Sequence, residues 1–121
     1  MKYTTSLRKN YEFRRLYNKG KSAASQCAVI YCRKNGKDAN RLGLTVSAKL
    51  GGAVQRNRIR RRLKEIYRLN EKYLAPGYDI VIVARARSRY ADYHEIESSV
   101  LSALKSLNIL RDIAARGDKG K

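Results

Sequence analysis

A segment over residues 54–73 constrains the fold more than any other part of the chain, because it follows a glycine pair at 51–52 and ends before Pro76-Gly77. At about 100° per residue its apolar side chains fall on one side, which predicts an amphipathic helix packed against the rest of the protein. That side is formed by Ile59, Leu63, Ile66 and Tyr73. The opposite side is a polar stripe of Asn57, Arg61, Lys64 and Arg68, flanked by Arg58 and Arg60.

The charge of this segment is part of a strong imbalance. The chain has 28 Lys and Arg against 10 Asp and Glu, and residues 1–68 alone hold 19 basic side chains against three acidic ones. Glu65 is the only acid between Lys49 and Arg68. Arginines at this density repel one another unless an anion relieves them, and a planar guanidinium grips phosphate through two hydrogen bonds. This predicts a nucleic-acid-binding face, with an acidic membrane surface as the second partner class and a solvated, ion-paired helix face as the alternative.

The length of 121 residues fits one domain, which we assign to residues 1–115, followed by a flexible basic tail at 116–121. The longest apolar run, at 80–84, is too short for a membrane span, and the first ten residues have no stretch typical of a signal peptide. Cys27 and Cys32 are expected to be buried, reduced thiols. With His94 as the only histidine, no zinc-binding set of known spacing is present. These features predict a cytoplasmic protein.

Further elements follow from local patterns. Asn10 is the expected cap of a short helix that ends at Gly20, residues 22–33 are extended, and residues 35–40 form a turn. Residues 42–46 alternate as a strand buried on one side, and the run at 80–84 predicts a strand covered on both faces. Asp92 and Glu95 open a last helix. The order of helix, two or three strands, helix, strand and helix predicts a small sheet with packed helices, of the α+β or α/β class.

A second candidate surface is aromatic. Phe13 and Tyr17 lie one turn apart on the first predicted helix, and Tyr31 projects from the extended segment after it. Aromatic rings beside basic side chains suit single-stranded nucleic acid, since stacking is worth about 1–3 kcal/mol per base and tolerates any sequence. Packing in the core is the alternative for Phe13, which shares helical spacing with Leu16. The basic neighbours are Arg14, Arg15, Lys19 and Arg33.

No group of residues has the pattern of an active site. Acid–base or metal catalysis needs converging carboxylates, a histidine pair or a positioned nucleophile. The acids here are scattered over helix surfaces or serve as caps, and His94 falls in the first turn of the last helix. The sequence predicts no catalytic residue and no metal ligand in this chain.

The basic segment also carries a specific pattern, Lys49-x-Gly51-x-Ala53-Val54-x-Arg56-Asn57-Arg58-x-x-Arg61. Together with Asn10-x-x-Phe13, Gly20 and Val29-Ile30-Tyr31 upstream, and with the strand at 79–85 and the last helix downstream, it resembles the bacterial ribonuclease P protein component. The resemblance extends over about residues 7–107.

The resemblance implies an α+β fold, a two-layer α/β sandwich in the order α-β-β-β-α-β-α, with a left-handed crossover and a likeness to the second domain of ribosomal protein S5. It implies that a large RNA subunit uses Mg²⁺ to hydrolyse a phosphodiester and remove the 5′ leader of precursor tRNA, while the protein binds no cofactor. The implied partners are ribonuclease P RNA and the leader, with no membrane and no DNA. The residues expected to bind the RNA subunit are Lys49, Arg56, Asn57, Arg58, Arg60, Arg61, Lys64 and Arg68. Those expected to bind the leader are Phe13, Tyr17, Tyr31, Arg14 and Arg33.

Three positions depart from the pattern of the family: Ala28 stands where relatives often have Phe, Ala48 where many have Lys, and Gly52 where many have Asn. In this chain, these departures call into question one contact that relatives make with the leader or near the Mg²⁺ of the holoenzyme.

Three other classes of protein are alternatives. A structural RNA-binding protein of the ribosomal type shares the charge, but has no need of the Arg-Asn-Arg block together with upstream aromatics. A DNA-binding module needs side chains spaced for base edges and a dimer element, whereas five arginines in the seven residues 56–62 suit backbone contacts. An autonomous nuclease needs metal-binding carboxylates.

Overall fold

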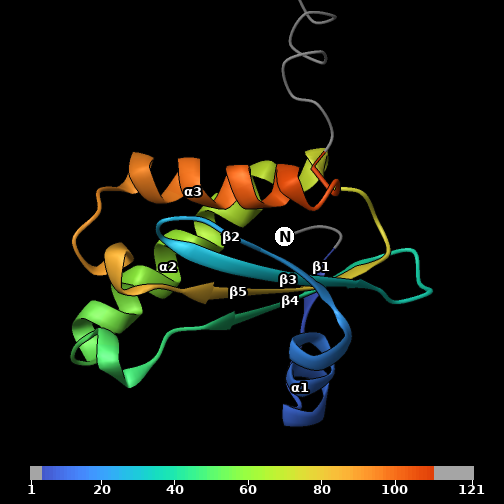
Figure 1. The fold of residues 1–121 in the computed structure, drawn as a ribbon, viewed down its shortest axis with the longest axis horizontal. Helices are drawn as coiled ribbons and strands as arrows, with labels where there is room; N and C mark the ends of the chain where they lie inside the picture. The colour runs from blue at the N-terminus through green and yellow to red at the C-terminus, as the bar shows by residue number, and fades with distance from the viewer. Residues whose placement is uncertain (1–3, 111–121) are drawn as a thin grey trace, which may run out of the picture.

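The computed structural model describes residues 4–110, so the tail predicted at 116–121 and the end of the predicted domain lie outside the described residues. Within that range, five strands form one mixed sheet in the order β1-β4-β5-β3-β2 (Figure 1). The strands are β1 (Thr4–Ser6), β2 (Lys21–Ala24), β3 (Ala28–Lys34), β4 (Asn40–Thr45) and β5 (Tyr78–Ala84). The helices are α1 (Asn10–Lys19), α2 (Ala53–Asn70) and α3 (Tyr93–Ser106), with short 3₁₀ helices η1 (Ala48–Leu50), η2 (Glu71–Tyr73) and η3 (Ala86–Arg89). The predicted α+β class is confirmed, and the handedness of the crossover stays a prediction.

Strand β5 runs through the middle of the sheet, parallel to β4 on one side and antiparallel to β3 on the other. Ile80, Val81 and Ile82 have no exposed surface. A central strand has to be apolar on both sides when both faces of the sheet are covered. The prediction for residues 80–84 is therefore confirmed.

The helices cover the two faces of the sheet unequally. Helices α2 and α3 pack on one face, and α1 lies on the other (Figure 1). The larger core joins sheet residues such as Ile82 to Leu63 of α2 and Val100 of α3. The smaller core joins Leu16 of α1 to Val81. Helices α1 and α2 therefore lie on opposite faces of the sheet.

Strand β1 was not predicted from the sequence. It pairs in parallel with β4, although its three residues are polar and show no alternation. The hydroxyl groups of Thr4 and Tyr67 share a hydrogen bond of 2.8 Å, which ties β1 to α2. Residues 22–33 contain two antiparallel strands, β2 and β3, rather than one extended segment.

The predicted cap of α1 is wrong by one residue. The helix begins at Asn10, and Lys9 occupies the cap position. The Glu12 carboxylate accepts hydrogen bonds from the backbone N–H groups of Lys9 (3.2 Å) and Arg8 (3.3 Å), which lower the pKa of Glu12. Gly20 ends the helix as predicted. A side chain is excluded at this position, because a Cβ would lie 2.6 Å and 2.9 Å from carbonyl oxygens of α1 and β3.

Helix α2 has the predicted apolar face, but it ends at Asn70, and Tyr73 lies in η2. Ile59, Leu63 and Ile66 are buried as predicted, and Tyr67 and Asn70 complete the buried face. The Asn70 amide donates to the carbonyl of Ile66 at 2.9 Å, so this buried polar side chain is satisfied.

The structure confirms the predicted start of α3 and the predicted state of the two cysteines. The Asp92 carboxylate accepts a hydrogen bond of 2.8 Å from the backbone N–H of Glu95, which caps the helix. The Glu95 side chain pairs with Arg87 rather than returning to the cap. Cys27 and Cys32 are buried and free, and burial raises the pKa of the Cys32 thiol.

Candidate nucleic-acid interface

The polar side of α2 is exposed, as its periodicity predicts. Arg60 donates a hydrogen bond of 3.1 Å to the Asn57 side chain, so an amide orients one of the guanidinium groups. Arg56 is half-buried, and its Nε has no hydrogen-bond partner among the described residues. The exposed members of the set predicted to bind the RNA subunit are Lys49, Asn57, Arg58, Arg60, Arg61, Lys64 and Arg68.

Arg68 differs from the other exposed arginines because it has an acidic partner. It donates two hydrogen bonds to Glu65, at 2.8 Å and 2.7 Å. These bonds lower the pKa of the Glu65 carboxyl. Both side chains are about half exposed, and a surface pair of this kind contributes little to stability. An RNA phosphate that binds Arg68 has to compete with Glu65, whereas Arg58, Arg60 and Arg61 take part in no ion pair within the described residues.

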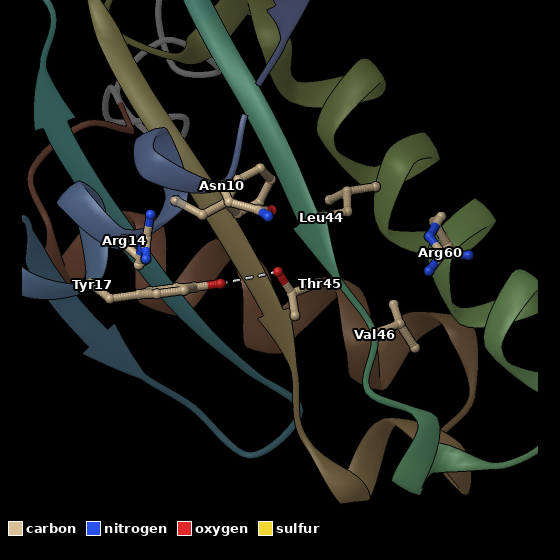
Figure 2. Close-up of a pocket in the computed structure, with 8 residues that line it drawn as sticks. Asn10, Arg14, Tyr17, Leu44, Thr45, Val46 and Arg60 are labelled. Atoms are coloured by element: carbon tan, nitrogen blue, oxygen red, sulfur yellow. Dashed lines mark hydrogen bonds between the residues drawn. The ribbon is translucent and has the colours of Figure 1, made fainter. Parts of the chain in front are cut away.

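A groove lies between α1 and α2, with β4 as its floor (Figure 2). Its outer part encloses about 580 Å³ and is lined by Asn10, Phe13, Arg14, Tyr17, Leu44, Thr45, Val46 and Arg60. The groove continues past Phe13 into a second part, where Ser6, Leu7, Leu42, Gly43 and Lys64 join the lining. No acidic residue belongs to either set, so the groove is aromatic, aliphatic and basic.

Two tyrosines predicted to bind the leader contact each other beside this groove, although only Tyr17 lines it. The rings of Tyr17 and Tyr31 are in edge-to-face contact, with centroids 5.0 Å apart and planes at 73°. The Tyr17 hydroxyl shares a hydrogen bond of 3.1 Å with the Thr45 hydroxyl on β4 (Figure 2). The Tyr17 side chain remains 39% exposed, so its ring is held in place and still accessible to a base.

Phe13 meets both of the expectations raised by the sequence. It lines the groove, and it also packs against the smaller core beside Leu16 and Val81. Its ring lies directly over Gly43 of β4, where a Cβ would come within 2.6 Å of two ring carbons. The absence of a side chain at Gly43 therefore lets the Phe13 ring approach the floor of the groove.

The remaining predicted positions divide between the groove and other places. Arg14 lines the groove, whereas Arg33 is exposed on β3 and does not line it. Ala28 is fully buried in the larger core, away from the groove. Arg60 and Lys64, which were predicted only for the RNA subunit, border the groove from α2. No sequence pattern marks Gly43 and Thr45, because their role depends on the packing of α1 over β4.

An ion-pair group fixes the start of α1 to the sheet. Arg41 of β4 donates to Glu12 of α1 and, at 2.8 Å and 2.6 Å, to both carboxylate oxygens of Asp79 on β5. Although burial opposes ionisation, hydrogen bonds from Arg41 and Asn35 hold the pKa of the Asp79 carboxyl below its usual range. Hydrogen bonding to Asp79 raises the pKa of Arg41 in turn. Glu12 and Asp79 are therefore both paired with Arg41.

The groove and the exposed side of α2 are suited to binding rather than to catalysis. Within residues 4–110, no three His, Cys, Asp or Glu side chains gather in an arrangement that could hold a metal ion. The described residues therefore do not fit the Mg²⁺ that the sequence resemblance implies. They can grip phosphates, stack bases and orient a strand.

A basic helix beside an aromatic, acid-free groove on a small α+β domain is typical of a protein that binds nucleic acid. The ribonuclease P family model matches residues 1–108, and the chain belongs to the ribonuclease P protein family. The resemblance seen in the sequence is confirmed.

The relatives span nearly the whole chain. The ribonuclease P protein component of Alkaliphilus oremlandii is 47% identical over 110 residues, which is 91% of this chain and 96% of that protein. The protein of the same name from Clostridioides difficile is 45% identical, over 88% of this chain and 94% of that protein.

Solved structures agree with the sequence relatives. The Staphylococcus aureus ribonuclease P protein superimposes with a TM-score of 0.81 at 34% identity, over 88% of this chain and 97% of that one. The Thermotoga maritima protein gives a TM-score of 0.74 at 33% identity, over 80% and 92%.

Membership of this family establishes what the protein does. It is an obligate subunit of a ribonucleoprotein endonuclease and acts with ribonuclease P RNA in processing the 5′ end of tRNA. No helix in the described part of the chain combines the length and apolarity needed to cross a bilayer.

Proposed function

We propose that the groove between α1 and α2 binds the unpaired 5′ leader of precursor tRNA, while the exposed side of α2 binds the RNA subunit. The observation that carries this proposal is Tyr17, which lines the groove and contacts the Tyr31 ring with centroids 5.0 Å apart. Unpaired bases can stack on such rings whatever their sequence, which a subunit acting on many precursors requires. Arg14 and Arg60 line the same groove and supply charge for the leader's phosphates.

The two RNA-binding surfaces meet at one edge of α2. Arg60 and Lys64 border the groove, while Arg61 projects from the helix side that faces away from the core. A leader in the groove and an RNA subunit on α2 therefore come within reach of the same helix. In this arrangement the protein places the leader beside the RNA that carries out the chemistry.

We propose that the RNA subunit holds the Mg²⁺ used in hydrolysis, since the described residues lack a suitable donor set. The chain contributes positive charge that offsets repulsion between the two RNAs, and it orients the leader. We expect it to work in the cytoplasm and to need neither DNA nor a membrane surface.

The test is the affinity of the assembled holoenzyme for two substrates, a precursor tRNA with a 5′ leader and the corresponding mature tRNA. Tyr17→Ala and Tyr31→Ala should each weaken binding of the precursor by about 1–3 kcal/mol and leave mature tRNA unaffected. Tyr11→Ala is the matched control for Tyr17→Ala, because Tyr11 lies on the same helix, is 50% exposed and does not line the groove. Equal losses on both substrates from folded variants would show that these rings belong to the scaffold alone.

A further inference from the structure

A second, smaller cleft lies on the other edge of α2, where η3 packs beside the first half of the helix. It encloses about 180 Å³ and is lined by Gln55, Arg58, Ile59, Arg62, Ser88, Arg89, Tyr90 and Ala91. Its lining contains three arginines and no carboxylate. Three guanidinium groups facing one small polar space repel one another unless an anion lies between them.

The cleft is built on fixed parts of the structure. Arg62 donates a hydrogen bond of 3.3 Å to the Ala91 carbonyl, which links α2 to the segment after η3. The buried Ser88 hydroxyl donates at 2.7 Å to the Arg85 carbonyl and holds the turn of η3. The Arg62 guanidinium is therefore held by a backbone contact across the cleft, and Ser88 holds the turn that carries Arg89.

An exposed ring stands at the mouth of this cleft. Tyr90 is 74% exposed, and the guanidinium carbon of Arg89 lies 5.5 Å from the centre of its ring. An aromatic ring so exposed beside an arginine offers a stacking surface for a base, next to donors for the adjoining phosphate.

We propose that this cleft binds one phosphodiester group of the RNA subunit, with a neighbouring unpaired base stacked on Tyr90. This inference rests on the proposed function, because the proposed function assigns the leader to the groove at the opposite edge of α2. Arg60 and Lys64 border the leader groove, whereas Arg58 and Arg62 border the cleft. The body of the helix separates the two, so the strand in the cleft is not the leader. The RNA subunit thus contacts η3 as well as the exposed side of α2.

Arg87 provides a matched control for Arg89. Both arginines are exposed and lie in η3, but Arg87 pairs with Glu95 at 2.7 Å and does not line the cleft. Arg87→Ala and Arg89→Ala remove the same charge from the same element. A purely long-range effect of charge on RNA binding would affect both variants alike.

The experiment measures the dissociation constant of the full chain for ribonuclease P RNA at several salt concentrations, with unfolding midpoints as a check. Arg89→Ala should weaken binding at least about fivefold more than Arg87→Ala, and it should lower the salt slope by slightly under one unit. Tyr90→Ala should weaken binding at least about fivefold, and Tyr90→Phe should retain it, because stacking needs the ring and not the hydroxyl.

A second measurement, with RNA-saturated holoenzyme, separates the two proposals. Affinity for leader-bearing precursor and for mature tRNA should be unchanged by Arg89→Ala and Tyr90→Ala. Loss of substrate affinity instead of RNA-subunit affinity would assign the cleft to tRNA and overturn the inference. Equal effects of Arg87→Ala and Arg89→Ala would also overturn it. If wild-type holoenzyme fails to prefer the precursor, the leader proposal fails, while the assembly measurement still decides whether the RNA subunit occupies the cleft.

Discussion

Replacing Gly43 with alanine is the sharpest test of how the leader groove is built. The new Cβ would lie 2.6 Å from two carbons of the Phe13 ring and 3.4 Å from the Leu7 Cβ. Non-bonded carbons prefer about 3.5–4.0 Å, so the ring has to retreat by about 1 Å. Overpacking of this kind costs about 1–3 kcal/mol. Phe13 is half-buried and can move toward the open groove, so we expect a loss of unfolding free energy near the lower end, about 1–2 kcal/mol.

The displaced ring also changes the groove, since Phe13 lines both of its parts. Gly43→Ala should therefore weaken holoenzyme affinity for leader-bearing precursor tRNA several-fold and leave affinity for mature tRNA unchanged. Urea unfolding of the isolated protein and equilibrium binding of the holoenzyme measure the two effects separately.

A double-mutant cycle identifies the contact responsible. In a Phe13→Ala background the ring is gone, so Gly43→Ala should cost less than about 0.5 kcal/mol in stability and nothing further in leader affinity. An equal cost in both backgrounds would show that the strain arises elsewhere on β4. Unchanged leader affinity in the folded single variant would refute the placement of the leader over Phe13.

Three further outcomes are expected. Replacing Arg58 and Arg61 together with alanine should weaken assembly with the RNA subunit, measured by filter binding, at about 1.5–3 kcal/mol per lost charged hydrogen bond, with an unchanged unfolding midpoint because both side chains are exposed. Gly20→Ala should lower the unfolding midpoint sharply, because its Cβ would meet two backbone oxygens at 2.6 Å and 2.9 Å that cannot move as side chains do. The carboxyl of Asp79 has a lowered pKa in the folded protein, so its contribution to stability is present above the unfolded pKa of about 3.9 and is lost as the pH falls through the folded value. Acid titration of unfolding should consequently show a flatter decline for Asp79→Asn than for the wild type, and parallel curves would contradict the role of its pairing with Arg41.

The elements that depend on local patterns could be predicted from the sequence. The apolar face of α2 followed from its helical period, and the burial of β5 on both faces followed from its continuous apolar run. Strand β1 could not be predicted, because its three polar residues gain their order from pairing with β4 and from the hydroxyl contact between Thr4 and Tyr67.

The candidate site could be predicted only where local residue patterns mark it. Aromatic and basic residue types identified Tyr17, Tyr31 and Arg14, and the structure places all three at or beside the groove. The contributions of Gly43 and of the cleft at η3 depend on contacts between segments far apart in the sequence. No local pattern marks such contacts, so only the folded chain reveals them.

The central claim is that this chain binds and positions RNA while a separate RNA subunit carries out hydrolysis. The most direct measurement incubates labelled precursor tRNA and Mg²⁺ with the purified chain alone, with ribonuclease P RNA alone, and with both together. At low Mg²⁺ concentration, the account predicts release of the 5′ leader only when both components are present, and no cleavage by the protein alone. Accurate 5′ processing by RNA-free protein would contradict it.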